Sequence, residues 1–196
     1  MIVSLKGTKL IALVVSLKGT DSIASGGSRR RDHRIDPVPE GDKFSPMAQT
    51  LFSCYMHIVF STKNRAKLIR PDVEEELFSY IGGVVRNYKG VLLAAGGTSN
   101  HIHLLVSTNK NKLLPNLIGD AKRETSSWIK TKSPMLSKFA WQDGYSAFSL
   151  GYTQIPAVKK YIAGQKEHHK QKLFEDEMRG FYKKYDLDFD EQYEWD

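Results

Sequence analysis

The sequence predicts an α+β fold, with helices packed on a largely antiparallel sheet and a connectivity related to the ferredoxin-like pattern. Segments with a two-residue and a helical apolar period follow one another as strand, helix, two strands, helix and strand. A short glycine-containing link joins the two central strands, which is typical of antiparallel neighbours. The 196 residues, of which 40% are hydrophobic, are enough for one domain with a core.

The first strand is predicted over residues 52–61. Alternation places Tyr55, His57 and Val59 on one face of it and apolar residues on the other. A helix over residues 71–89 follows, because apolar residues recur at helical spacing between a proline at its start and a glycine after its end.

The second half of the pattern has two strands, a helix and a last strand. Gly96 and Gly97 form the predicted turn between the two strands, and a proline in the first turn suits the start of the next helix. The predicted elements are strands over 91–95 and 100–107, a helix over 113–131 and a strand over 145–150.

The strand after the turn carries a pair of histidines. His101 and His103 point to one face, whereas Ile102, Leu104 and Val106 point to the other. The two imidazoles would stand roughly 6.6 Å apart along the strand, close enough to bind one divalent cation. The pair alone fits an exposed polar strand face equally well, since His-x-His is a short pattern. His57 has no spaced partner, which favours a structural role for it.

A later helix is predicted from Thr153 or Gln154 to about residue 172. Tyr161 and Gln165 are four residues apart and share one face of it. His168 continues that face. Spacing alone favours an ordinary amphipathic helix. The run Glu167-His168-His169 is interpreted as a solvated helix face, because no further ligand lies at a useful spacing.

Charge divides the chain into three parts. Residues 1–46 carry +3 and contain a repeated Val-Ser-Leu-Lys-Gly-Thr; they are predicted to be a flexible extension or a misassigned start. Residues 47–172 carry +10, which fits a protein that holds a polyanion, and residues 173–196 form an acidic tail of −6.

The amino-acid composition limits the cellular compartments that suit the protein. The single cysteine excludes an internal disulfide and fits the cytoplasm. No apolar run approaches the ~20 residues of a membrane span.

Several basic side chains are candidate contacts for DNA phosphates, although a solvated surface explains them as well. The candidates are Lys63, Arg65, Lys122, Arg123, Lys160 and His168.

Three motifs in order resemble the single-tyrosine HUH transposases of the insertion sequence 200/605 group. They are Asn100-His101-Ile102-His103-Leu104-Leu105-Val106, Trp141-Gln142-Asp143-Gly144-Tyr145-Ser146-Ala147-Phe148-Ser149, and Tyr161-Ile162-Ala163-Gly164-Gln165-Lys166-Glu167-His168-His169. The resemblance covers about residues 47–196. It implies Mg²⁺ or Mn²⁺ bound by His101, His103 and Gln165, with Tyr161 as the nucleophile on single-stranded DNA.

The resemblance also implies a 5′-phosphotyrosine intermediate, DNA with hairpin ends as substrate, and a homodimer whose tyrosine helix could act in the partner's site. Residues 1–46 have no counterpart in the family, and Gly164 stands where the family often has a larger polar residue.

Two rival functions follow from the same residues. One is a hairpin-binding or single-stranded DNA-binding protein of the same fold without transposition. The other is a hydrolase in which His101 and His103 hold a metal that activates water; it predicts turnover without a covalent adduct.

Overall fold

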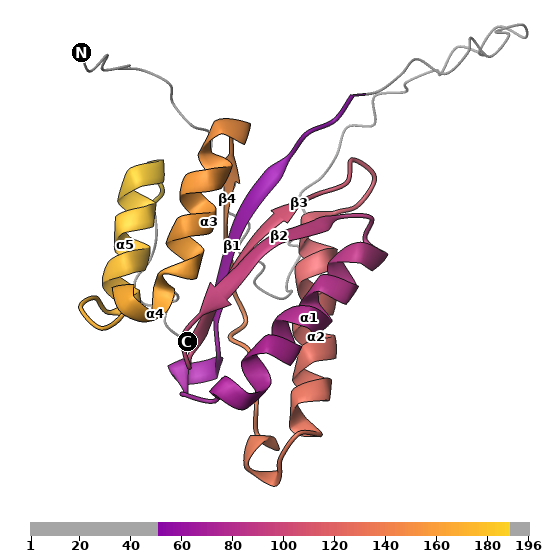
Figure 1. The fold of residues 1–196 in the computed structure, drawn as a ribbon, viewed down its shortest axis with the longest axis vertical. Helices are drawn as coiled ribbons and strands as arrows, with labels where there is room; N and C mark the ends of the chain where they lie inside the picture. The colour runs from indigo at the N-terminus through magenta and orange to yellow at the C-terminus, as the bar shows by residue number, and fades with distance from the viewer. Residues whose placement is uncertain (1–50, 189–196) are drawn as a thin grey trace, which may run out of the picture.

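The computed structural model describes residues 51–188, so the predictions for residues 1–46 and for the end of the acidic tail lie outside the described residues. Four strands form one antiparallel sheet in the order β2-β3-β1-β4. This is the strand order of the ferredoxin-like pattern, and the predicted α+β fold is confirmed (Figure 1). The elements are β1 Tyr55–Ser61, α1 Pro71–Asn87, β2 Val91–Gly97, β3 His101–Ser107, α2 Leu114–Lys130, β4 Ser146–Leu150, α3 Ile155–Ala163, α4 Gln165–His168 and α5 Phe174–Tyr185.

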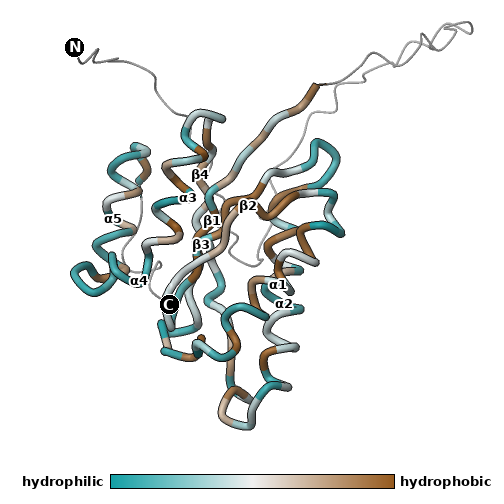
Figure 2. The backbone as a smooth tube through the Cα atoms, in the orientation of Figure 1, coloured by the Kyte–Doolittle hydropathy of each residue, from teal (hydrophilic) through white to brown (hydrophobic). Residues whose placement is uncertain are grey.

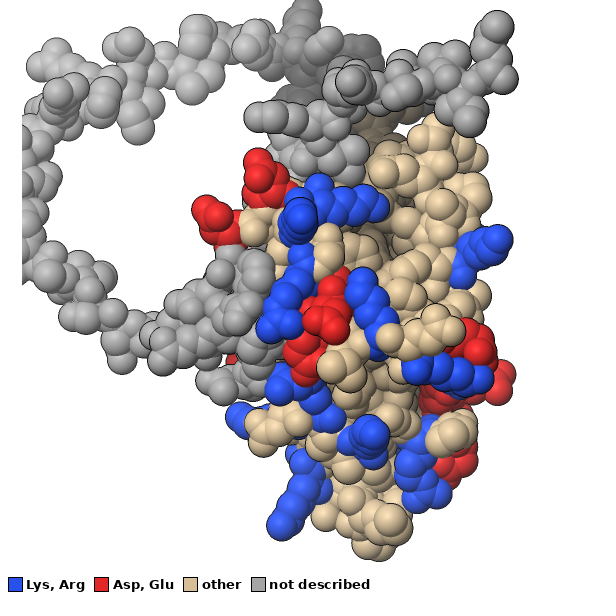
Figure 3. Space-filling model, turned by 90° about the vertical axis from the view of Figure 1, so that its left-hand side faces the viewer, with Lys and Arg blue, Asp and Glu red and all other residues tan. Residues whose placement is uncertain are grey.

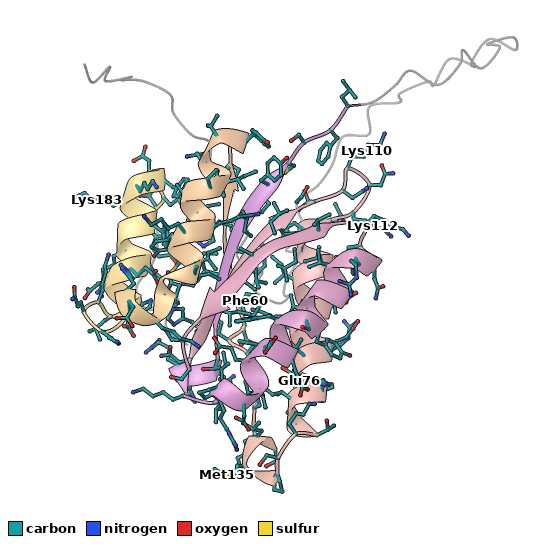
Figure 4. The ribbon with its side chains drawn as sticks, viewed as in Figure 1. Phe60, Glu76, Lys110, Lys112, Met135 and Lys183 are labelled. Atoms are coloured by element: carbon teal, nitrogen blue, oxygen red, sulfur yellow. The ribbon has the colours of Figure 1, made fainter. Side chains whose placement is uncertain are left out.

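Helices α1 and α2 cover one face of the sheet, where the main core lies (Figure 1). The tube coloured by hydropathy shows the apolar stretches of the strands and of these helices facing one another (Figure 2). The alternation predicted for β3 holds, because Ile102, Leu104 and Val106 are all buried in this core. Phe60 of β1 points from the sheet toward the same helices (Figure 4).

Helices α3 and α5 lie on the opposite face (Figure 1). A second apolar cluster joins α5 to the sheet, and its buried members are Val59, Phe148, Phe174, Met178, Tyr182 and Tyr185. The acidic segment from residue 173 therefore contains a helix that packs on the sheet in its described part. Lys183 projects from the outer side of this helix, away from the sheet (Figure 4).

The structure corrects the predicted helix that runs without a break to about residue 172. Helix α3 ends at Ala163, Gly164 separates it from the single turn of α4, and α5 begins at Phe174. The amide of Gly164 still donates to the carbonyl oxygens of Lys160 and Tyr161, at 3.1 and 3.2 Å. Glycine in a helix interior is less stable than alanine by about 1 kcal/mol, which fits the break at this residue.

Strand boundaries differ by a few residues from the prediction. Strand β1 begins at Tyr55 rather than at residue 52, and β2 continues through Gly96 and Gly97, so the turn begins two residues later than predicted. In that turn the Thr98 amide donates to the His101 carbonyl oxygen at 3.0 Å. Among residues 51–188, no helix has the length and apolar character needed to cross a membrane.

Candidate metal and tyrosine site

His101 and His103 lie side by side on β3, on the face covered by α3 and α5. Their side chains are 1% and 0% exposed, and their ring centroids are 5.2 Å apart. Two-residue alternation and a neighbouring strand on either side fix this placement. The pair is therefore buried in a polar centre on the sheet face opposite the main core. The alternative interpretation, an exposed polar strand face, is wrong.

Helix α3 delivers Tyr161 to the same place within one chain. The tyrosine ring lies 5.9 Å from the ring of His103 and 6.2 Å from that of His57, edge-on to both. Gly96 permits this approach. It pairs with His103 in the sheet, and a Cβ atom there would lie 2.5 Å from the Ile162 carbonyl oxygen. The backbone of α3 thus packs against β2 beside His103.

Gln165 is buried beside the tyrosine, as the shared helix face predicted. Its side chain is 1% exposed, and its Nε2 donates to Glu177 Oε1 at 3.1 Å. Its Oε1 has no hydrogen-bond partner among the described residues. A buried amide oxygen left free in this way is an available ligand for a hard cation.

Two residues that the sequence interpretation left out complete the centre. Glu177 of α5 is 2% exposed, and its carboxyl group accepts a hydrogen bond from the Tyr161 hydroxyl. His169 Nε2 lies 3.1 Å from Glu177 Oε2. The interpretation of His168 and His169 as a solvated helix face is therefore wrong, because His169, one helical turn after Gln165, contacts Glu177 and the His168 ring lies 5.6 Å from the Tyr161 ring. The signal available in the sequence was a histidine pair followed eight residues later by an acid in an apolar helix.

The donor atoms fit a divalent cation. One ligand atom each from His101, His103, His169 and Glu177 lies within 4.8 Å of all the others. His101 Nε2 and His103 Nε2 are buried and have no hydrogen-bond partner among residues 51–188. Imidazole nitrogens with carboxylate or amide oxygens suit Mn²⁺ and also accept Mg²⁺.

Burial keeps this centre uncharged when no ion is bound. It lowers the pKa of His101 to about 2 and that of His103 to about 3. Burial also raises the pKa of Glu177 to about 8, so the acid is mostly protonated at pH 7. Protonated Glu177 can donate from Oε2 to His169 while Oε1 accepts from Tyr161 and Gln165. Its contacts with the imidazoles are therefore hydrogen bonds or close approaches of neutral groups, and not ion pairs.

The basic candidates for DNA binding lie in different parts of the molecule. Lys63 and Lys160 are exposed, and the Arg65 guanidinium is paired with Glu175 at 2.8 Å. His168 is half-buried, with its ring 5.6 Å from the Tyr161 ring. The face that carries α5 shows many Lys and Arg side chains interspersed with acids (Figure 3).

Lys122 and Arg123 belong to α2, on the sheet face opposite the histidines. The Lys122 ammonium donates to the carbonyl oxygens of Gln142, at 3.0 Å, and of Gly144, and it lies 4.9 Å from the Phe60 ring centroid. Burial lowers its pKa to about 8. Arg123 pairs with Asp120 at 2.7 Å and is 67% exposed. Lys122 thus joins α2 to the loop before β4.

Two solved structures are similar to this chain. A crystal structure from Deinococcus radiodurans R1 assigned as a transposase is 16% identical, covers 60% of this chain and 95% of its own, and gives a TM-score of 0.48. The REP-associated tyrosine transposase bound to a REP hairpin is 14% identical, covers 64% of this chain and 74% of its own, and gives a TM-score of 0.47. No curated protein matches the chain.

The sequence match to a family is direct. Residues 50–165, more than half of the chain, match the family described as "Transposase IS200 like". That stretch contains the histidine pair, the tyrosine and the glutamine. The chain therefore belongs to the IS200-like transposase family.

Proposed function

We propose that this transposase cleaves and rejoins single-stranded DNA through a covalent link to Tyr161, with a divalent cation at the histidine pair. One observation carries the proposal. The phenol of Tyr161 and the free Nε2 atoms of His101 and His103 meet in one buried centre of one chain. A nucleophile beside an ion site is what attack on a phosphodiester requires.

The ion would be Mg²⁺ or Mn²⁺, held by His101, His103 and the free oxygen of Gln165, with His169 and Glu177 within reach of the same point. When bound, such an ion offsets the charge of a phosphate oxygen and polarises the phosphorus. The protein places the ligand atoms before the ion binds, since His101 and His103 lie on a strand paired on both sides and Gln165 lies at the start of α4.

In the proposed reaction the Tyr161 oxygen attacks phosphorus, and the bond from phosphorus to the 3′ oxygen breaks. The products are a 5′-phosphotyrosine and a DNA strand whose 3′ oxygen leaves as a hydroxyl after taking up a proton. The phenolic proton passes to Glu177 Oε1, to which the hydroxyl already donates in the resting site, when that carboxyl is ionised. The phosphotyrosine retains the energy of the broken ester, so a 3′-hydroxyl can later attack it and rejoin strands without ATP.

DNA has to reach groups that are buried in the structure described here. His103 and Gln165 are 0% and 1% exposed, and α5 covers them. A phosphate therefore contacts the ligands only after α5 shifts from the sheet. Membership of the family and the +10 charge of residues 47–172 support single-stranded DNA with hairpin ends as the substrate, and the cytoplasm as the setting.

The test is a covalent adduct. Labelled single-stranded DNA from the flanks of the gene, incubated with Mn²⁺, should give a protein–DNA species that survives denaturation. Tyr161→Phe should abolish it, whereas the control Tyr152→Phe should not, because Tyr152 is 75% exposed and lies outside the site. An adduct that persists in Tyr161→Phe overturns the nucleophile. DNA cleavage without any adduct favours the hydrolase.

A mixing experiment tests the family's implied homodimer with exchanged tyrosine helices. Because Tyr161 lies beside the histidines of its own chain, we propose that the tyrosine acts in cis. A mixture of His103→Ala and Tyr161→Phe proteins should then remain inactive. Recovery of the adduct on mixing would show that the tyrosine serves the partner's site.

A further inference from the structure

His57 is a buried histidine that the proposed reaction does not use. It lies on β1 opposite Leu105, and so it is a diagonal neighbour of His103 on the same sheet face. Its side chain is 2% exposed, and its ring stacks on that of His103 with centroids 5.2 Å apart. His57 Nε2 is 3.0 Å from His103 Nδ1, a hydrogen-bond distance.

The other two imidazoles of the centre are held in the same way through Nδ1. His101 Nδ1 lies 2.8 Å from Asn100 Oδ1 and 3.0 Å from Thr98 Oγ1. His169 Nδ1 lies 2.8 Å from the Lys172 carbonyl oxygen. In all three imidazoles Nδ1 is engaged outside the centre, and Nε2 is the nitrogen that faces Glu177 inside it.

This arrangement has a consequence for tautomers. A neutral imidazole carries one N–H, and only the other nitrogen can bind a metal. The Lys172 carbonyl can only accept, so it fixes the proton of His169 on Nδ1; Asn100 Oδ1 does the same for His101. His103 differs, because the group at its Nδ1 is an imidazole, which can either donate or accept.

We propose that His57 is a positioning residue of the metal site: its Nε2 accepts the Nδ1 proton of His103 and holds the His103 Nε2 lone pair toward the ion. The unpartnered state of His103 Nε2 agrees with this assignment. The packing of the His57 ring against Phe181, at 5.4 Å between centroids, keeps the acceptor in place. The inference rests on the metal site of the proposed function and adds a residue to it.

The experiment compares Mn²⁺ affinity, measured by electron paramagnetic resonance, in three variants. His57→Phe keeps a ring but has no acceptor, and should weaken binding by about 10- to 100-fold. His57→Gln places an amide oxygen near the former Nε2 and should recover most of the loss. The control Ser146→Ala removes another buried polar contact, to Tyr182 at 2.9 Å, and should leave the affinity unchanged.

A second readout needs neither metal nor activity. In the metal-free protein, ¹⁵N NMR of the imidazoles should show His103 protonated on Nδ1, and His57→Phe should shift it toward the other tautomer. Unchanged Mn²⁺ affinity in a folded His57→Phe protein, or a wild-type His103 protonated on Nε2, overturns the inference. Failure of the wild-type protein to bind Mn²⁺ while His103 shows the expected tautomer instead counts against the metal site itself.

Discussion

The Tyr161 hydroxyl donates a hydrogen bond to the carboxyl group of Glu177, and this contact joins the tyrosine helix α3 to the last described helix, α5. Glu177 is thereby in contact with the proposed nucleophile and with the imidazole ligands. Glu177 is buried, which is rare for an acid unless it has partners such as these. The acidic part of the chain thus supplies a side chain to the site.

Replacing Glu177 by Gln should weaken Mn²⁺ binding by at least about tenfold, because a neutral amide replaces a group that ionises when a cation binds. Isothermal titration of the metal-free protein measures this. Glu175→Gln, on the same helix and paired with Arg65, is the matched control and should bind Mn²⁺ normally. Equal affinity in both variants would mean that Glu177 contacts only the tyrosine.

The metal-free protein should be most stable near pH 7. Below that value the unfolded chain binds protons that buried His57, His101 and His103 exclude, so the free energy of unfolding falls as pH falls, by up to about 1.4 kcal/mol per pH unit for each imidazole. The folded chain keeps the Glu177 proton up to about pH 8, against 4.5 when unfolded, so this group lowers stability as pH rises through that range. Below about pH 7 the three imidazoles outweigh the one carboxyl.

Urea unfolding in EDTA across pH 4.5 to 8 measures this optimum. In Glu177→Gln the loss of stability above about pH 7 should disappear, while the loss of stability at acid pH stays. If the free energy of unfolding still falls with rising pH in this variant, another group is responsible for the fall.

Substitutions of Lys122 and of Lys160 should have opposite effects on stability and on DNA binding, although both residues are basic. Lys122→Met removes the donor to the half-buried carbonyl oxygens of Gln142 and Gly144 and should lower the free energy of unfolding by about 1–3 kcal/mol without weakening DNA binding. Lys160→Met, at an exposed position beside Tyr161, should weaken DNA binding and leave stability unchanged. Urea unfolding and fluorescence anisotropy separate the two, and weaker DNA binding in a stable Lys122→Met protein would return Lys122 to the DNA surface.

Gly96→Ala should misplace the tyrosine without removing the metal ligands. The new Cβ would meet the Ile162 carbonyl oxygen at 2.5 Å, so α3 has to move outward. A displacement of about 1 Å can slow such chemistry about 100-fold, and single-turnover adduct formation measures it. Mn²⁺ affinity should change little. Gly119→Ala, where a Cβ meets nothing within 4 Å, is the control and should react at the normal rate.

Much of the site follows from local periodicity. Alternation along β3 determines that His101 and His103 share one face, and helical spacing determines that Tyr161 and Gln165 share another. The ordered motifs indicated the family, which the match over residues 50–165 shows. These features depend on neighbours within a few residues, so the sequence alone determined them.

Other features depend on which distant segments meet. Apolar packing of α5 against β1 and β4 brings Glu177 to the centre, where it meets His169. In the sequence Lys122 resembles a phosphate contact. In the structure it donates instead to the carbonyl oxygen of a residue 20 positions away. Only the tertiary structure decided these roles, because burial and hydrogen-bond partners arise from helix packing that no local period encodes.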